Sequence, residues 1–384
     1  MKILHTSDWH IGKRLMDRER LPEQREALEE LVRICEDEQA DVVLVAGDVF
    51  DTFMPSAEAE EVFFHAVKRL AGARRAVVLI SGNHDDGVRL AASAPISAEE
   101  GVYLFGGSKR ALPVGGTRGV RAVGAGENYL LLENEAGERL YVNALPYPNE
   151  ARLKEEKTEE TYAEKVARWI SCGAETRGEG VPYVLLTHLF AAGGAASESE
   201  RDIQLGGARI VPIDCFPADA FTALGHLHKR QRLRDNVYYS GSLLQYSFDE
   251  ANIPKSVAIL KTEGDKVVFE KEVPLTSGRK LVRLEAAGVE QALALLRRYE
   301  NAFVELTLHL NAPLTAQETL SLREANEGLV SLIVRTQTAV DAPEIVRSAL
   351  SSEELFVEYY KSVYGEPPSD ELKEAFLELL GEGA

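Results

Sequence analysis

Five short motifs along the chain carry side chains that can bind metal ions. In chain order they are Asp8-Trp9-His10, Gly47-Asp48-Val49-Phe50-Asp51, Gly82-Asn83-His84-Asp85, Thr187-His188 and Gly225-His226-Leu227-His228. Their metal-binding groups are carboxylates, an amide oxygen and imidazoles, and no cysteine takes part. Such a set is typical of manganese, iron or zinc in a reactive centre, whereas structural zinc usually takes thiolates. The motifs therefore predict a metal centre that performs chemistry.

Two cations about 3.5–4 Å apart can polarise a phosphoryl group, activate water and stabilise the leaving oxygen. Such a pair needs one carboxylate that both cations share, and Asp48, directly after a glycine, is the expected bridge. Asp8, His10 and one of the later histidines could hold one metal. Asn83, His188 and the other later histidine could hold the second. The predicted metal ligands are Asp8, His10, Asp48, Asn83, His188, His226 and His228.

The remaining polar residues of the second and third motifs suggest a different role. His84 follows a candidate ligand, and we expect it to give a proton to the leaving oxygen or to contact the phosphate as a cation. Asp51 could hold the other nitrogen of that ring, because a carboxylate favours a protonated imidazole.

His226 and His228 are two residues apart, which would place both on the same side of an extended strand, as two adjacent metals require.

The motifs follow segments with the pattern of buried strands. Short strand-like runs precede them at residues 2–7, 42–46, 76–80, 183–186 and 221–224, and the runs at 42–46 and 76–80 are wholly apolar. Segments with helical spacing of apolar residues separate the first three runs, so the pattern is that of an α/β sheet. Ligands bind at the carboxyl ends of strands in such sheets. The order of elements therefore places the motifs together at one edge.

The character of the sequence changes near residue 275. Residues 281–334 alternate strand and helix patterns as β-α-β-α-β, which predicts a small separate domain. Two amphipathic helices are expected in residues 341–384, with Pro367-Pro368 between them. We therefore expect three parts, namely residues 1–274 with the motifs, a small α+β domain at 275–340, and helices at 341–384.

Length and composition limit the class of protein. The chain has 384 residues, 45% of them hydrophobic and 27% charged, as expected for a globular protein with two or three domains. No run of about 18 apolar residues is present, so no membrane span is expected. Three scattered cysteines favour buried thiols in a reducing cytoplasm over a disulfide framework.

The net charge of −19 argues against a protein that coats nucleic acid, because such surfaces are usually basic. It leaves room for a local basic groove and for metals that supply positive charge. Lys229-Arg230-Gln231-Arg232-Leu233-Arg234 and Lys13-Arg14 could contact DNA phosphates. A charge run is equally well explained as a solvated face.

The five motifs together resemble the calcineurin-like metallophosphoesterase superfamily. Longer stretches are similar to the nuclease subunits of double-strand-break repair complexes within it. These stretches are Ile3-Leu4-His5-Thr6-Ser7-Asp8-Trp9-His10-Ile11-Gly12, Thr187-His188-Leu189-Phe190-Ala191-Ala192-Gly193-Gly194 and Tyr239-Ser240-Gly241-Ser242-Leu243-Leu244-Gln245-Tyr246-Ser247-Phe248. The resemblance implies an α-β-β-α sandwich with a small capping domain and C-terminal helices. It covers residues 1 to about 260, and the remainder agrees only in layout.

The resemblance also implies roles for single residues. One metal would take Asp8, His10, Asp48 and His228, and the other would take Asp48, Asn83, His188 and His226. His84 would be the catalytic histidine, with Asp51 as its partner. Some relatives carry histidine at the position of Asp51, so the role of Asp51 as partner of the catalytic histidine is not shared by the whole family.

Family membership further implies two manganese ions and cleavage of DNA phosphodiesters, at duplex ends and at hairpins or single strands. It implies a homodimer bound to an ABC-type ATPase, on which the C-terminal helices could dock. No G-x-x-x-x-G-K-[ST] motif occurs in the chain, so ATP hydrolysis would belong to that partner.

The motifs are also compatible with two other functions. A broad phosphodiesterase or phosphatase would use the same ligands, although it would not need the region after residue 275. A non-catalytic scaffold could keep the fold to bind a partner, although such proteins normally lose ligands and every expected ligand type is present here.

Overall fold

The structure is a computed structural model of the chain. It describes residues 1–107, 111–116, 119–149, 159–200 and 209–336, together with 356, 357, 360, 367–370, 372, 373 and 376. The chain divides into two compact units, Met1–Arg335 and Thr336–Ala384. The sheets and helices below belong to the first unit.

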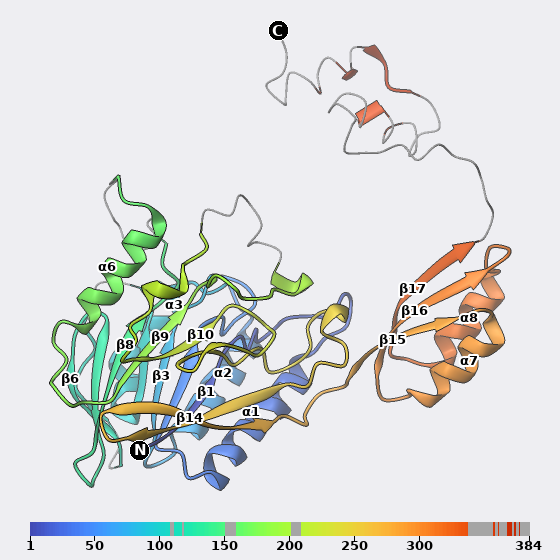
Figure 1. Cartoon of the computed structure of the whole chain (residues 1–384). Coiled ribbons are helices and arrows are strands. Elements are labelled where there is room, and N and C mark those ends of the chain that lie inside the picture. The colour runs from blue at the N-terminus through green and yellow to red at the C-terminus, as the bar shows by residue number, and fades with distance from the viewer. Residues whose placement is uncertain are drawn as a thin grey trace. The chain divides into compact units, whose positions relative to one another are not determined.

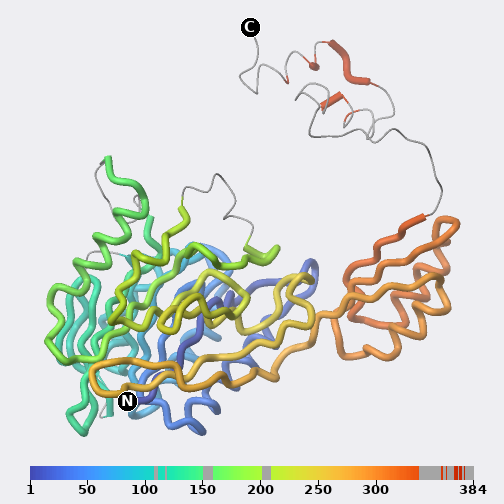
Figure 2. Tube along the Cα trace, viewed as in Figure 1, coloured from blue at the N-terminus to red at the C-terminus, as the bar shows by residue number. Residues whose placement is uncertain are grey.

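The first sheet carries the first three motifs. It has six strands in the order β14 (Lys266–Pro274), β13 (Ser256–Glu263), β1 (Lys2–Thr6), β2 (Val42–Ala46), β3 (Ala76–Ile80) and β4 (Val102–Phe105). Strands β1 to β4 are parallel, and β13 joins β1 in antiparallel pairing. In Figure 2 the segment of β13 and β14 lies along the strand that begins at the N-terminus.

Two helices, α1 (Leu21–Asp37) and α2 (Ala57–Ala71), cover the outer face of this sheet (Figure 1). The side chain of Ser56 caps α2 by accepting a hydrogen bond from the backbone N–H of Ala59 at 3.2 Å. Because helices cover one face and the second sheet covers the other, all five residues of β2 are buried. A continuous apolar run is the pattern expected for such a strand.

The second sheet carries the last two motifs. It has eight strands in the order β11 (Gln231–Arg234), β12 (Val237–Tyr239), β10 (Phe221–Gly225), β9 (Tyr183–His188), β8 (Arg139–Leu145), β7 (Tyr129–Glu133), β6 (Arg121–Ala125) and β5 (Gly115–Gly116). Helix α6 (Tyr162–Ala174) packs on its outer face (Figure 1). A capping box between Thr161 and Glu164 starts that helix.

The two sheets pack face to face over one apolar core. Val42 and Leu44 of β2 point into this core with Leu186 and Ala223 of the second sheet. The alternate residues Val43 and Val45 face the helices instead, because side chains alternate across a strand. Each fully buried aliphatic side chain contributes about 1.5–3 kcal/mol relative to an exposed one. The predicted α-β-β-α sandwich is confirmed.

Glycines allow the strand ends to approach one another where the motifs begin. A Cβ atom at Gly82 would lie 2.1 Å from Oδ1 of Asp48, and one at Gly225 would lie 1.8 Å from the carbonyl oxygen of Ala46. A side chain at either position would push the two sheets or the two loops apart. The glycine before a candidate ligand therefore sets how closely the ligands can gather.

A third, smaller sheet is built after residue 280. Strands β15 (Leu281–Ala286), β16 (Phe303–Leu310) and β17 (Leu329–Thr336) carry α7 (Val289–Arg298) and α8 (Ala316–Ala325) and enclose an apolar core of their own. The predicted β-α-β-α-β order is found, and we call this part the cap. The domain boundaries at 274 and 340 remain a prediction.

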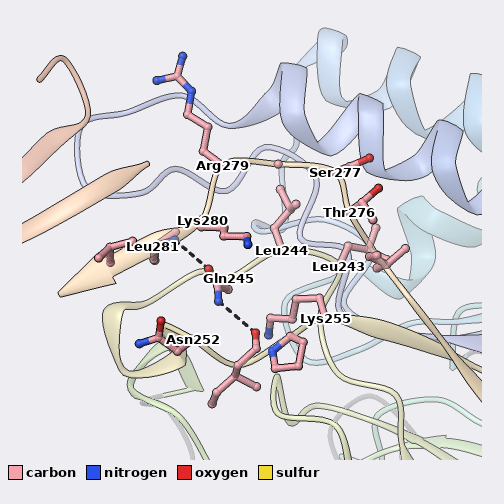
Figure 3. A pocket seen from close by; sticks show the side chains of 15 residues that line it. Leu243, Leu244, Gln245, Asn252, Lys255, Thr276, Ser277, Arg279, Lys280 and Leu281 are labelled. Carbon is pink, nitrogen blue, oxygen red and sulfur yellow. Dashed lines mark hydrogen bonds between the residues drawn. The ribbon is translucent and has the colours of Figure 1, made fainter. Parts of the chain in front are cut away.

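The connection between the sandwich and the cap is held by polar side chains. The carboxylate of Glu30 accepts hydrogen bonds from the backbone N–H groups of Thr276 and Ser277. Gln245 accepts from the N–H of Leu281 at 2.8 Å and donates to the carbonyl of Ile253 at 3.0 Å, beside a cavity of about 520 Å³ (Figure 3). These contacts tie the first strand of the cap to the segment that follows the fifth motif.

Short helical turns complete the first unit. They are α3 (Gly87–Leu90), η1 (Ala91–Ser93), α4 (Ala94–Ser97), η2 (Ala98–Glu100), η4 (Ile213–Cys215) and η5 (Phe248–Glu250). Among the described residues, no helix is both long and apolar enough to cross a membrane.

The predicted C-terminal helices at 341–384 lie mostly outside the described residues, although the rings of Phe356 and Phe376 stack there with centroids 4.1 Å apart.

Candidate metal centre

All seven candidate ligands and His84 gather where the carboxyl ends of the central strands of both sheets meet. Asp8 and His10 follow β1, Asp48 follows β2, and Asn83 with His84 follows β3. His188 ends β9, and the other two histidines follow β10. The backbone N–H of Asp8 donates to the carbonyl of Gly47 at 3.0 Å, which locks the first two loops together. The predicted gathering of the motifs at one edge is found.

One group of ligand atoms is formed by Asp8, His10 and His228, whose donor atoms all lie within 4.8 Å of one another. The Nε2 atoms of His10 and His228 are 2.9 Å apart. Asp8 is fixed by the hydroxyl of Ser7 at 2.5 Å and by the backbone N–H of His226 at 3.0 Å. The three side chains are buried, so their donor atoms converge on one protected point.

A second group is formed by Asp48, His188 and His226. The amide oxygen of Asn83 joins it, lying 2.9 Å from Nε2 of His188 and 2.9 Å from Nδ1 of His226. Oδ2 of Asp48 lies 3.4 Å from Nε2 of His188 and 3.6 Å from Nε2 of His10. This oxygen therefore faces one histidine of each group.

The backbone is strained at the same residues. Among the described residues other than glycine, those with a positive φ angle include Asp8 (51°), His10 (45°), Asp48 (49°) and His226 (99°). Left-handed backbone is disfavoured for residues with a side chain, and such strain concentrates at functional sites. Four of the seven candidate ligands are thus held in conformations that the fold imposes.

The electrostatics of the two ligand groups favour cations. Burial alone would lower the pKa of His188, but the carboxylates of Asp48 and Asp8 raise it to about 9. Burial opposes ionisation of Asp48 too, yet the imidazoles of His188 and His10 hold its pKa well below the usual range. Buried charges are normally paired or bound to metal. The donor set and its negative charge fit divalent metal ions.

Asp51 differs from its expected role. Nδ1 of His84 lies 2.9 Å from the backbone carbonyl oxygen of Asp51, not from its carboxylate. A carbonyl only accepts, so this nitrogen carries the proton. The carboxylate lies 3.3 Å from Nδ1 of His10 and 2.8 Å from Nζ of Lys13. The side chain of Asp51 therefore contacts a candidate ligand, while its backbone holds His84.

The two histidines of the fifth motif also differ from expectation. Strand β10 ends at Gly225, so His226 and His228 lie in the loop beyond it. The φ angle of 99° at His226 turns the chain, and the two rings enter different ligand groups. Their separation comes from this turn and not from the repeat of an extended strand.

Two residues that hold the site were not identified from the sequence. The buried carboxylate of Asp85 accepts hydrogen bonds from the backbone N–H groups of Val49, Phe50 and Gly82 at 2.8–3.1 Å. Its position in the third motif was visible, but its partners were not. Tyr246 donates its hydroxyl to the carbonyl of Trp9, and its ring contacts both His10 and His228. That tyrosine lies in one of the stretches that resemble the family, but nothing in the sequence showed that it contacts the ligands.

The basic run after the fifth motif is neutralised within the structure. Lys229 pairs with Asp249, Arg230 with Glu272, Arg232 with Asp235 and Arg234 with Asp214. These pairs favour the solvated-face interpretation over a DNA-binding surface. Lys13 pairs with Asp51 at the edge of the ligand groups.

Comparison with known proteins agrees with this geometry. A family model of calcineurin-like phosphoesterases matches residues 1–229. The chain is 37% identical over 399 residues to the D subunit of the nuclease SbcCD of Bacillus subtilis, covering 99% of this chain and 97% of that protein. It is 36% identical over 378 residues to the D subunit of the nuclease SbcCD of Rhodobacter capsulatus, covering 88% of this chain and 89% of that protein.

The chain is therefore a calcineurin-like phosphoesterase, a class defined here by both the sandwich and the site. Within that class it belongs to the family of SbcCD nuclease D subunits, since the similarity runs through the cap and covers nearly the whole length of the Bacillus protein. The resemblance drawn from the motifs is confirmed.

Proposed function

We propose that this protein is a manganese-dependent DNA nuclease and the D subunit of an SbcCD-type complex. The observation that carries the proposal is the position of Asp48, whose Oδ2 faces His10 at 3.6 Å and His188 at 3.4 Å. A carboxylate between two ligand groups is what a pair of cations requires. Similarity over most of the chain to two proteins named as the D subunits of SbcCD nucleases supports the choice of substrate and complex.

The residues that would hold one cation are Asp8, His10, Asp48 and His228, and those that would hold the other are Asp48, Asn83, His188 and His226. The contacts among these side chains support this division. Oxygen and imidazole ligands without thiolates suit manganese. Burial lowers the pKa of His10 to about 3, which keeps that ring in the neutral form that binds metal.

The reaction is hydrolysis of a DNA phosphodiester. When bound, the cations supply Lewis acidity at the phosphoryl oxygens and make a water molecule more acidic. The ligand side chains would fix the cations, and their burial limits the access of bulk water. In its imidazolium form His84 gives the proton on Nε2 to the leaving oxygen and keeps the proton on Nδ1, which it donates to the carbonyl of Asp51.

The protein acts with partners. The ATPase is of the SbcC type, as the names of the two similar SbcCD subunits suggest. The chain itself has no G-x-x-x-x-G-K-[ST] motif, so ATP hydrolysis belongs to that partner. Two copies of the chain form a homodimer within a heterotetramer, and residues 341–384 dock on the ATPase. The cap, within residues 275–340, guides DNA to the site. The substrates are double-strand ends and hairpins, and the complex works in the cytoplasm.

Cleavage of a labelled DNA hairpin tests the function. With Mn²⁺ we expect cleavage by the purified chain, its loss in EDTA, and a change in rate when an SbcC-type ATPase and ATP are added. A chromogenic phosphodiester is assayed in parallel. Hydrolysis of that ester without DNA cleavage would identify a broad phosphodiesterase, and elemental analysis without bound metal would identify a scaffold.

Changing Asp51 to asparagine is expected to weaken Mn²⁺ binding by about tenfold, as for other residues that orient a ligand histidine. The reason is the 3.3 Å contact of its carboxylate with His10. The cleavage rate is measured against Mn²⁺ concentration and should approach that of the wild type at saturation. The backbone carbonyl that holds His84 is unchanged by this substitution.

Asp17→Asn, the same change at an exposed residue, is the control and should leave the Mn²⁺ dependence unaltered. A rate for Asp51→Asn that stays about a hundredfold low at saturating Mn²⁺ would contradict this prediction, because that loss is the usual size of a direct contribution to proton transfer. It would show that the carboxylate acts on the reaction itself and not on metal affinity.

A further inference from the structure

The ring of His228 is held by two residues that lie outside all five motifs. Its Nδ1 atom is 2.7 Å from the hydroxyl oxygen of Ser199, and that hydroxyl donates to Oε1 of Glu250 at 2.8 Å. Ser199 lies after β9 and Glu250 lies in η5, so two distant segments of the chain meet behind this ring.

The direction of these hydrogen bonds can be assigned. The carboxylate of Glu250 accepts, so the single hydroxyl proton of Ser199 points to it. The oxygen of Ser199 must then accept from His228, which places a proton on Nδ1 of the ring. The lone pair of Nε2 is left facing Nε2 of His10, 2.9 Å away. The relay therefore selects the tautomer that can bind a cation beside His10.

Glu250 is itself fixed in place. It is buried, and its other carboxylate oxygen accepts from Nζ of Lys255 at 2.5 Å. The same ammonium donates to the backbone carbonyl of His228 at 2.8 Å. The hydroxyl of Ser247 also donates to Glu250, at 2.9 Å. A buried carboxylate held by this many donors keeps both its charge and its position.

The segment that carries Ser199 is attached to the same region. The carboxylate of Glu200 accepts from the backbone N–H of His228 and from that of Ser197. The N–H of Glu198 donates to Asp249 at 3.1 Å. Ser199 is thereby held on both sides, so its contact with His228 is a built feature of the site.

Other candidate ligands are held differently. His188 has Nδ1 2.8 Å from the backbone carbonyl of Ala46, and Nδ1 of His10 lies near the carboxylate of Asp51. Replacing Glu250 or Ser199 changes neither of these contacts. A change at the relay should therefore act on one ligand group and spare the other.

We propose that Glu250, acting through Ser199, is a positioning residue for the cation held by Asp8, His10 and His228. Groups that orient a ligand histidine typically change metal affinity by about 10–100-fold when they are replaced. The inference rests on the proposed two-metal function, since it concerns the affinity of one of the two metals.

The test measures Mn²⁺ binding directly, by calorimetric titration of the metal-free full-length chain. Glu250→Gln and Ser199→Ala are each expected to weaken one of two binding events by about 10–100-fold and to leave the other within about threefold. Ser199→Thr keeps a hydroxyl and should restore tight binding. Glu263→Gln, the same change at an exposed carboxylate, is the matched control.

Cleavage gives a second readout. For Glu250→Gln and Ser199→Ala, the Mn²⁺ concentration for half-maximal DNA cleavage should rise by the same factor, and the rate at saturating Mn²⁺ should recover. If Glu250→Gln fails to fold, Ser199→Ala decides, because it removes one hydroxyl and leaves the pair of Glu250 and Lys255 intact.

The outcomes separate this inference from the proposed function. Two tight Mn²⁺ ions in the wild type and in a folded Ser199→Ala variant would overturn the inference alone. A wild-type chain that binds no Mn²⁺ would overturn the proposed function and the inference with it. Weakening of both binding events equally would also reject the relay, because it would indicate a general loss of structure.

Discussion

Replacing Asp48 with asparagine is expected to lower the rate of Mn²⁺-dependent DNA cleavage by roughly 1,000-fold or more. Metal ions supply several kcal/mol of transition-state stabilisation, and each 1.36 kcal/mol is about a factor of ten in rate. The amide would keep one oxygen to accept the backbone N–H of His84, as Oδ1 of Asp48 does at 2.9 Å. It would lose the charge that faces both His10 and His188.

The measurement pairs cleavage with metal content. Both Mn²⁺ ions should be lost together from Asp48→Asn, while the circular dichroism spectrum stays that of the wild type. Asp37→Asn, at an exposed position at the end of α1, is the control for the substitution itself. Full occupancy by two metals in Asp48→Asn would rule out the shared carboxylate on which the function rests.

Replacing His84 with alanine is expected to lower DNA cleavage by about 100- to 10,000-fold, the usual contribution of a positioned general acid. Both Mn²⁺ ions should remain bound. Metal content matters here because a nitrogen of His84 lies within 4.8 Å of ligand atoms of His10 and Asp48. Loss of a metal from His84→Ala would make this residue a ligand and contradict its role as a proton donor.

A second substrate tests the proton transfer itself. A nitrophenyl phosphodiester has a leaving group that departs without a proton, so His84→Ala should slow its hydrolysis far less than it slows DNA cleavage. His65→Ala, at an exposed histidine of α2, is the control. Equal loss with both substrates would indicate that His84 binds the phosphate and does not act as an acid.

The core strands and the motifs could be predicted because their signals are local. The runs at 42–46 and 76–80 are short, apolar and rich in β-branched residues, and they form β2 and β3 with the expected bounds. A candidate ligand follows each run within three residues, so strand order alone predicted the gathering. The order of elements in the cap was readable for the same reason.

Other predictions were wrong because they depend on angles that a spacing does not contain. The spacing of two residues predicted that His226 and His228 lie on one extended strand. In the structure β10 ends at Gly225, and the chain turns at His226. Asp51 was assigned to His84 through its carboxylate, but its carbonyl makes that contact. Which group of a residue reaches its neighbour depends on the backbone conformation at that point.

The amino-acid sequence by itself determined the class of protein, the seven candidate ligands and His84, because residue type and short intervals along single strand ends carry that information. The residues alone left open which later histidine joins each group, and the resemblance implied the division. The tertiary structure decided how the donor atoms meet and what holds each buried imidazole. Ser199 lies in the segment after β9, and Tyr246 and Glu250 lie together in the segment after β12, so these residues reach His228 only in the folded chain. Interactions between distant segments depend on the packed geometry, and a linear pattern does not record it.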